Sequence, residues 1–264
     1  MSTRRITVDQ FQYEESSLGK NAIGSQHYHD FFEIYFLEEG SCHYFIDDDA
    51  YDVRAGDVVL IPEGTIHKTM YDDTEHRRRL IYCNASYIPP TVSHRLASMH
   101  FIYRNDKVTE RIRSLFDLIA REYTAPDEFS KDVILHYVHL LFFLLVRHTD
   151  GSMPHRSGNA YTTQTIAYIK QNYAEEIRLS DLARRCSISP EHLSRLFKQE
   201  TGFGVSEYLS MIRLQQAQRL LKESPALSIA TVAGLCGYND SNYFSEQFKR
   251  MHGVSPLRYR NEDT

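Results

Sequence analysis

Three histidines and one glutamate are spaced in the sequence so that they could share a ligand. His27, His29 and Glu33 have the same parity, so in a continuous strand their side chains lie on one face. His67 follows a Pro-Glu-Gly turn at residues 62–64 that could bring it to the same place. An unpaired buried carboxylate is costly, so a divalent metal, a bound ligand or hydrogen-bond partners must offset it. Three His and one Glu suit Zn, Fe, Mn or Ni, whereas the alternative is a hydrogen-bonded, metal-free pocket floor.

The residues between these positions indicate which face points inward. Ile34 and Phe36 have the opposite parity, and if they pack beneath helices, the His/Glu face looks into the interior. We therefore predict a ligand pocket lined by His27, His29, Glu33, Tyr35 and His67, with His27, His29, Glu33 and His67 as the metal ligands. His43 and Tyr82 are further polar candidates that the pattern does not single out.

The elements around this pocket read as strands followed by helices. Residues 27–90 contain short Val/Ile/Tyr/Phe runs separated by turn residues, which predicts a small antiparallel barrel. Residues 107–123 and 128–148 read as helices. The second is apolar on more than one face, so we expect it to pack against both the barrel and a second subunit, or to be an internal core helix. The polar stretch 149–159 contains Gly, Ser and Pro and reads as a linker.

The second half of the chain repeats itself at an offset of about 50 residues, and each unit reads as a short helix, a tight turn and a second helix. Ala183, Cys186, Ser194, Phe197, Lys198 and Gly202 recur as Ala233, Cys236, Ser245, Phe248, Lys249 and Gly253. The expected N-caps are Ser180, Ser189, Ser228 and Asp240, and the expected helix stops are Gly202 and Gly253. Residues 205–223 predict one connecting helix about 28 Å long, close to the ~34 Å of one duplex turn.

Helical spacing leaves a polar face outward in each unit. Leu193 and Phe197 in the first unit, and Phe244 and Phe248 in the second, should face inward. The outward residues are Glu191, Ser194, Arg195, Lys198, Ser241, Asn242, Glu246 and Lys249. Such groups suit base edges in a major groove, and the two Lys suit phosphates. A merely solvated face is the alternative for one unit, but two copies at a fixed offset favour DNA binding.

Composition excludes several other classes of protein. The chain has 264 residues and a net charge of −5, with 13 Lys/Arg against 11 Asp/Glu in residues 160–264, so DNA contact requires a local basic face. Its four Cys are far apart, which signals neither a disulfide framework nor a zinc finger. We find no signal peptide and no stretch that would span a bilayer, and expect a cytoplasmic protein with no membrane partner.

Residues 161–261 resemble the DNA-binding domain of the AraC/XylS family of bacterial transcription regulators. The resemblance is carried by Leu182-Ala183, Ser189-Pro190-Glu191-His192-Leu193-Ser194-Arg195-Leu196-Phe197-Lys198, Gly202, Tyr208, Arg213, Ala217, Leu220-Leu221, Ile229, Val232-Ala233, Gly237-Tyr238, Tyr243-Phe244, Phe248-Lys249, Gly253, Ser255-Pro256 and Tyr259-Arg260. It implies that Glu191, Ser194, Arg195, Ser241, Asn242 and Glu246 occupy base-reading positions. Glu246 departs from the basic residue found there in some members.

Residues 24–71 resemble the two motifs of the cupin family, which implies a small β-barrel with the metal site described above. Asn21 replaces the expected leading Gly, and Tyr71 replaces the Asn that often closes the second motif. Regulators of the AraC type frequently place such a barrel first, as an effector-binding and dimerisation domain. The expected fold class is therefore α+β multidomain: a cupin-like barrel with packed helices over residues 1–150, a linker over 151–160 and an all-α domain with two helix-turn-helix units over 161–264.

Two functions compete at this stage. The doubled helix-turn-helix and the domain order favour a sequence-specific transcription regulator that responds to a small effector, with a sugar as the family-level guess. The complete three-His, one-Glu set instead favours a metal-dependent cupin enzyme, a dioxygenase or isomerase, fused to a DNA-binding domain. We predict the regulator, without catalytic residues. Its expected partners are double-stranded DNA, the effector, a second copy of the chain and, for an activator, RNA polymerase, and the only cofactor considered is a divalent metal in the barrel.

Overall fold

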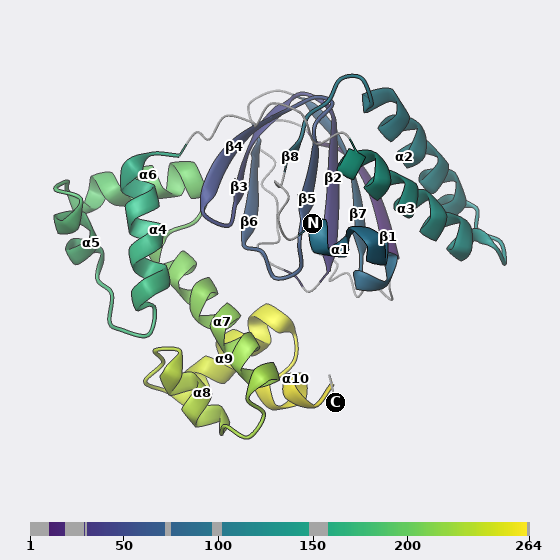
Figure 1. The fold of residues 1–264 in the computed structure, drawn as a ribbon. Coiled ribbons are helices and arrows are strands. Elements are labelled where there is room, and N and C mark those ends of the chain that lie inside the picture. The colour runs from purple at the N-terminus through teal and green to yellow at the C-terminus, as the bar shows by residue number, and fades with distance from the viewer. Residues whose placement is uncertain are drawn as a thin grey trace. The chain divides into compact units, whose positions relative to one another are not determined.

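The structure is a computed structural model that describes residues 11–18, 29, 31–71, 75–96, 102–147 and 158–262. The chain divides into two compact units, residues 1–157 and 158–264. This division falls within the stretch predicted as a linker. The first unit contains all the described strands and the second contains only helices among its described elements, so the mixed α and β architecture expected from sequence is present (Figure 1).

The first unit is built from two antiparallel sheets. A five-stranded sheet has the order β1-β7-β2-β5-β8, and a three-stranded sheet has the order β4-β3-β6. Their strands are β1 (Phe11–Leu18), β2 (Phe32–Glu39), β3 (Ser41–Ile46), β4 (Asp49–Arg54), β5 (Val58–Ile61), β6 (His67–Tyr71), β7 (His76–Cys83) and β8 (Ile102–Tyr103). Buried side chains from both sheets form one core between them, so the sheets pack face to face.

Strand β2 shows how alternation separates two cores. Ile34 and Phe36 pack in the core that the five-stranded sheet shares with its helices. Tyr35 and Leu37 point to the opposite side, into the core between the sheets. The parity prediction is therefore confirmed: the face that carries Glu33 looks into the interior.

Helices α2 (Thr109–Thr124) and α3 (Ser130–Arg147) cover the outer face of the five-stranded sheet (Figure 1). Both helices were predicted from sequence, to within two residues at each end. The buried face of α3 is narrower than expected, because Leu141 and Leu145 are buried in this core while Leu140 is 51% exposed. The 3-10 turn η1 (Ala85–Tyr87) and helix α1 (Pro90–Leu96) complete this unit.

The first strand lies outside residues 27–90, the stretch whose pattern predicted the barrel strands. Phe11–Leu18 forms β1 and pairs with β7 along its whole length. Tyr13 of this strand is buried in the core under the helices. Residues 1–10, 19 and 20 lie outside the described residues.

The second unit repeats the same helix pair. Its helices are α4 (Ala160–Asn172), α5 (Leu179–Arg185), α6 (Pro190–Thr201), α7 (Val205–Glu223), α8 (Ile229–Leu235), α9 (Ser241–His252) and α10 (Pro256–Glu262). Helices α5 and α8 have 7 residues each, and α6 and α9 have 12 each, so the sequence repeat is a structural repeat. The predicted connecting helix over 205–223 is α7.

Local capping explains where these helices begin and end. Ser189, Ser228 and Asp240 each accept a backbone N–H at a helix start, as predicted. Gly202 and Gly253 end α6 and α9 in the left-handed conformation, at φ +75° and +81°. The predicted cap at Ser180 is wrong. Helix α5 begins earlier, at Leu179, because backbone N–H groups at positions 181 and 182 already donate to the Arg178 carbonyl.

None of the helices in the described parts of the chain combines the length and the apolarity needed to cross a membrane.

Candidate effector pocket and nucleic-acid interface

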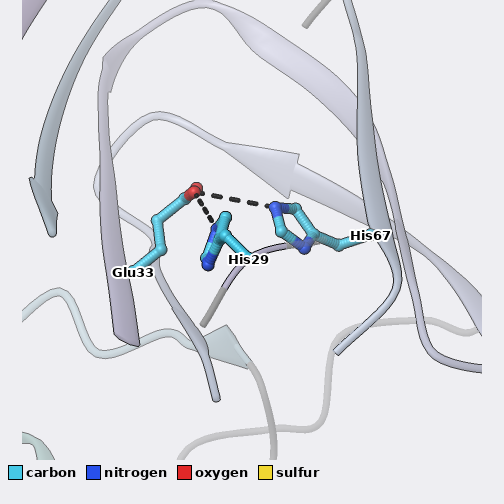
Figure 2. Close-up of side chains that lie close together, drawn as sticks. All are labelled: His29, Glu33 and His67. Carbon is cyan, nitrogen blue, oxygen red and sulfur yellow. Dashed lines mark hydrogen bonds and ion pairs between the residues drawn. The ribbon is translucent and has the colours of Figure 1, made fainter. Parts of the chain in front are cut away.

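Three of the four predicted ligand residues meet between the two sheets of the first unit. Glu33 comes from β2 in the five-stranded sheet, His67 from the start of β6 in the three-stranded sheet, and His29 from the segment before β2. Figure 2 shows both imidazoles aimed at the carboxylate. The Glu33 Oε2 atom lies 3.1 Å from His29 Nε2 and 3.6 Å from His67 Nε2. Their potential ligand atoms all lie within 4.8 Å of one another. His27 lies outside the described residues.

Backbone carbonyls orient both imidazoles. His29 Nδ1 lies 2.9 Å from the Phe31 carbonyl oxygen, and His67 Nδ1 lies 2.8 Å from that of Thr65. Because a carbonyl can only accept, each Nδ1 must carry the hydrogen. Each Nε2 then either carries a second hydrogen, which makes the ring a cation paired with Glu33, or offers its lone pair to a metal. A backbone carbonyl on the far nitrogen is the usual support of a metal-bound His.

The Glu33 carboxylate is buried and still ionised. Its residue is 5% exposed, and burial alone would raise its pKa. Hydrogen bonds from His29 and His67 outweigh burial and hold the pKa of Glu33 well below its usual range. Tyr44 donates its hydroxyl hydrogen to Glu33 Oε1 over 2.9 Å. The side chains of His29, His67 and Tyr44 therefore offset the free-energy cost of burying this charge.

Tyr44 is a site residue that the sequence reasoning missed. It lies on β3 with the same parity as Cys42 and Ile46, which also face the core between the sheets. This parity was a usable signal, because His43, named among the weaker candidates, has the opposite one. His43 is wrong as a pocket residue: its side chain is 53% exposed and pairs with Asp52 over 2.7 Å.

The predicted pocket residue Tyr35 lies deeper in the same interior. It is fully buried, and its ring meets that of Tyr44 edge-on at 5.4 Å. Its hydroxyl lies 3.8 Å from Cys42 Sγ. Burial, then the neighbouring Cys42, raises the pKa of Tyr35 well above its usual value, so the hydroxyl stays neutral. The Tyr35 hydroxyl adds a hydrogen-bonding group to the interior, and within the described residues it neighbours Cys42 and does not hydrogen-bond to Glu33.

Aromatic rings wall the cluster on the side of His29. Phe31 stacks on the His29 ring at 3.9 Å, and Tyr82 meets Phe31 edge-on at 5.1 Å. Further along the same interior, Arg78 donates to the Tyr71 hydroxyl and, over 3.0 Å, to Ser16 Oγ. The interior thus combines ring faces with hydroxyl, carboxylate and guanidinium groups.

Helix α6 presents the first predicted DNA-binding face. Leu193 and Phe197 are fully buried, which anchors one side of the helix. Glu191, Arg195 and Lys198 are exposed and Ser194 is half-buried on the other side. His192, which the sequence reasoning left out, accepts a hydrogen bond from Arg195 Nη2 over 3.2 Å.

Helix α9 presents the corresponding face in the second repeat. Phe244 and Phe248 are fully buried. The predicted residues Asn242, Glu246 and Lys249 are exposed and Ser241 is half-buried. Tyr243, at the repeat position of His192, is also 54% exposed. Each lies three positions before a predicted outward residue, Arg195 or Glu246, so helical spacing was the signal that could have added both to the predicted set. Contact of any of these residues with bases or phosphates stays a prediction.

Two family models match the chain, one in each unit. An AraC-like ligand binding domain matches residues 20–138, and a helix-turn-helix domain matches residues 182–262. The chain belongs to the AraC/XylS family of transcription regulators. An AraC-family regulator binds DNA through its helix-turn-helix domain and carries a ligand-binding domain on the same chain. In this chain the ligand-binding domain comes first and the helix-turn-helix domain second.

Relatives with curated names span nearly all of this AraC-family chain. It is 28% identical to the HTH-type transcriptional activator RhaS of Citrobacter koseri, over 89% of this chain and 87% of the relative. It is 27% identical to the HTH-type transcriptional activator RhaR of Mannheimia succiniciproducens, over 89% and 86%. Among solved structures, the C-terminal domain of AraT, a response regulator from Geobacillus stearothermophilus, is 33% identical over 39% of this chain and 86% of that one, with a TM-score of 0.38.

Proposed function

We propose that this AraC-family protein is an effector-responsive transcription activator. Residues 1–150 would bind the effector and a second copy of the chain, and residues 161–264 would bind DNA through two helix-turn-helix units. The observation that carries the proposal is the helix pair repeated as α5–α6 and α8–α9, with two buried apolar anchors and an exposed polar face in each copy. The relatives named transcriptional activators support activation, and an activator would also contact RNA polymerase.

Selection from random DNA tests this function on the full-length protein. We expect an enriched motif with two separated segments, one for each recognition helix, because two major-groove contacts need two stretches of bases. Binding should weaken steeply with salt, since Lys and Arg displace counterions from phosphates. Failure to enrich any motif would overturn the proposed function.

The effector pocket is proposed to lie in the cupin-like barrel formed by the two sheets, around Glu33. Its ring faces and hydrogen-bonding groups suit a small polyhydroxyl molecule such as a sugar. A thermal-shift screen of neutral sugars with the full-length protein is the first probe. Glu33→Gln keeps the shape and removes the charge, so it should change the response to a stabilising sugar in a reporter assay while leaving basal DNA affinity unchanged. An unaltered response would contradict the pocket assignment.

The same cluster is proposed to accept a divalent metal. Three ligand atoms converge there, and both imidazoles are oriented by backbone carbonyls as metal ligands are. Zn²⁺ titration should stabilise wild-type protein, and His67→Gln should abolish the effect. His43→Gln removes an exposed histidine elsewhere and should leave the effect intact. An equal response in His67→Gln would contradict this metal site.

The converging ligands are also what favours the second candidate, a metal-dependent enzyme. An enzyme would be recognised by turnover of a substrate with metal-loaded wild-type protein and by loss of that turnover in His67→Gln.

Dimerisation is proposed to use the outer surface of the α2–α3 hairpin. Two large apolar side chains of α3 and the turn before it are exposed, Phe129 at 61% and Leu140 at 51%. A second copy of the chain would cover them. Leu141 and Leu145 of the same helix are buried in the unit's own core, so changing them would unfold it. Leu140→Glu is the better test: it should convert a sedimenting dimer to a folded monomer, and a wild-type protein that is already monomeric at micromolar concentration would contradict the proposal.

A further inference from the structure

Two copies of the same tight turn in the second unit differ in one feature. In the first copy, between α5 and α6, Ser187 has a positive φ of 56°. In the second, between α8 and α9, Gly237 occupies the corresponding position with φ +79°. Since a serine already adopts this conformation in the first turn, the left-handed backbone alone does not require glycine in the second.

Close packing explains the glycine. A Cβ added at Gly237 would lie 2.7 Å from the carbonyl oxygen of Ala174 and 2.9 Å from Arg213 Nη2. Ala174 belongs to the segment that follows α4, more than sixty positions earlier in the chain. The turn of the second helix pair is thus pressed against the end of the helix that supports the first pair, and only a residue without a side chain fits there.

Arg213, near the middle of α7, ties these segments together. Its Nε donates to the Tyr173 carbonyl over 2.7 Å, and its Nη2 donates to the Glu175 carbonyl over 2.8 Å. These carbonyls lie just beyond the C-terminus of α4, where backbone oxygens lack helical partners and a cation is favourable. The same guanidinium lies over the Tyr238 ring, 5.6 Å from its centroid.

We propose that Arg213 and Gly237 form a clamp that holds the two helix pairs in one fixed relation, and so sets the spacing at which α6 and α9 read DNA. Without the clamp, the pairs would be joined through α7 and its packing alone. Arg213 is then a positioning residue: it acts through the placement of the recognition helices and need not touch DNA. The inference rests on the proposed DNA-binding function of both helix pairs.

The physical basis is effective concentration. When one recognition helix is bound, a rigid connection holds the other at the correct groove, and its binding is effectively intramolecular. A loose connection spreads the second helix over many positions and lowers that advantage. Loss of the clamp should therefore weaken binding to the complete site by about tenfold to hundredfold, while binding to each half of the site changes less than about twofold.

Spacing preference is the test, measured with full-length protein on the motif selected by the wild type. The DNA series inserts one to five base pairs between the two halves, and separate duplexes carry each half alone. Arg213→Ala and Gly237→Ser should lose full-site affinity and accept altered spacings almost equally. Gly237→Ser gives the second turn the residue of the first, so the turn itself tolerates it. Arg213→Lys, which keeps the charge but not the two-pronged geometry, should lie between wild type and Arg213→Ala.

Two control variants separate the clamp from general effects. Arg219→Ala removes an exposed arginine from the same helix, and Ser187→Gly changes the corresponding turn of the first pair; both should keep the wild-type spacing preference. Unchanged full-site affinity and spacing in Arg213→Ala and Gly237→Ser would overturn the clamp. Equal loss for half-sites and full sites, including in Arg213→Lys, would also overturn it, because that pattern indicates general unfolding. A wild type that selects no motif would instead overturn the proposed function.

Discussion

The polar residues of the proposed effector pocket and those of the proposed recognition helices, α6 and α9, are held in place in opposite ways. Glu33, His29 and His67 are each less than 9% exposed and are bonded to one another. On α6 and α9, polar residues such as Arg195 and Asn242 are exposed, and the buried anchors of the helices fix their positions from behind.

This difference separates stability from recognition. In the pocket each polar group offsets the burial cost of another, so a substitution changes folding as well as ligand binding. On the recognition helices water solvates the polar groups in the free protein, so a substitution should change DNA binding and leave folding nearly untouched. The proposed pocket needs both sheets to be folded, whereas the helix faces need only two anchored helices.

The largest effect is expected from removing both imidazoles. The double variant His29→Leu/His67→Leu should lower the free energy of unfolding of the first unit by about 3–5 kcal/mol, because it leaves the buried Glu33 carboxylate with only the Tyr44 hydroxyl to stabilise its charge. Urea denaturation measures the loss. Adding Glu33→Gln to the double variant should recover part of it, and a triple variant no more stable than the double would show that the charge is not the cause.

Base reading should give the next largest effect. Arg195→Ala should cost about 1–3 kcal/mol in DNA binding, confined to one base position of the selected motif, with the free energy of unfolding changed by less than about 0.5 kcal/mol. Lys198→Ala is the matched contrast: it should weaken all sequences similarly and reduce the slope of log K against log salt by about 1. Equal, sequence-independent losses in both variants would remove the distinction between base and phosphate contacts.

A cap at the start of α9 tests whether that helix is specified locally. Asp240 accepts the backbone N–H groups of Asn242 and Tyr243 over 2.7 and 2.9 Å. Asp240→Ala should lower stability by about 1 kcal/mol, measured by thermal unfolding, whereas Asp240→Asn keeps an accepting oxygen and should lose less. Equal losses of stability in Asp240→Ala and Asp240→Asn would show that the accepting oxygen of the cap does not specify the start of α9.

The smallest effect is expected from a histidine in the first unit that has no neighbouring carboxylate among the groups that shift its pKa, whereas His29 is paired with Glu33. Within the described residues His139 Nε2 is buried without a hydrogen-bond partner. Burial, and then the neighbouring His136, lower the pKa of His139. The folded state therefore resists a proton that the unfolded chain accepts near pH 6.5, so this group makes stability fall as pH drops below that value. His139→Gln should flatten the decline between pH 7 and 5 in denaturation midpoints, and an unchanged slope would contradict it.

The sequence alone determined the features that depend on neighbouring residues. Helical periodicity placed Leu193, Phe197, Phe244 and Phe248 on the buried faces. Hydroxyl and carboxylate caps predicted three of the helix starts, and the repeat predicted that the helix pair occurs twice. Strand parity predicted that Glu33 faces inward while Ile34 and Phe36 face the helices. The repeat is visible from residue identities at an offset of about 50. Each of the other features depends on a period of two or 3.6 residues or on a hydrogen bond across two or three positions, so the information lies within a few residues.

Tertiary structure decided the features that join distant segments. Tyr44 meets Glu33 because two separate sheets pack face to face, and no local spacing relates positions eleven apart on different strands. Phe11–Leu18 becomes a strand because β7 offers it an edge with which to pair. Gly237 is needed because the end of α4 approaches within contact distance, whereas its repeat counterpart Ser187 meets no such requirement. Close packing selects residue size and hydrogen-bond partners between segments, and the pattern along one segment carries no record of which other segment it will meet.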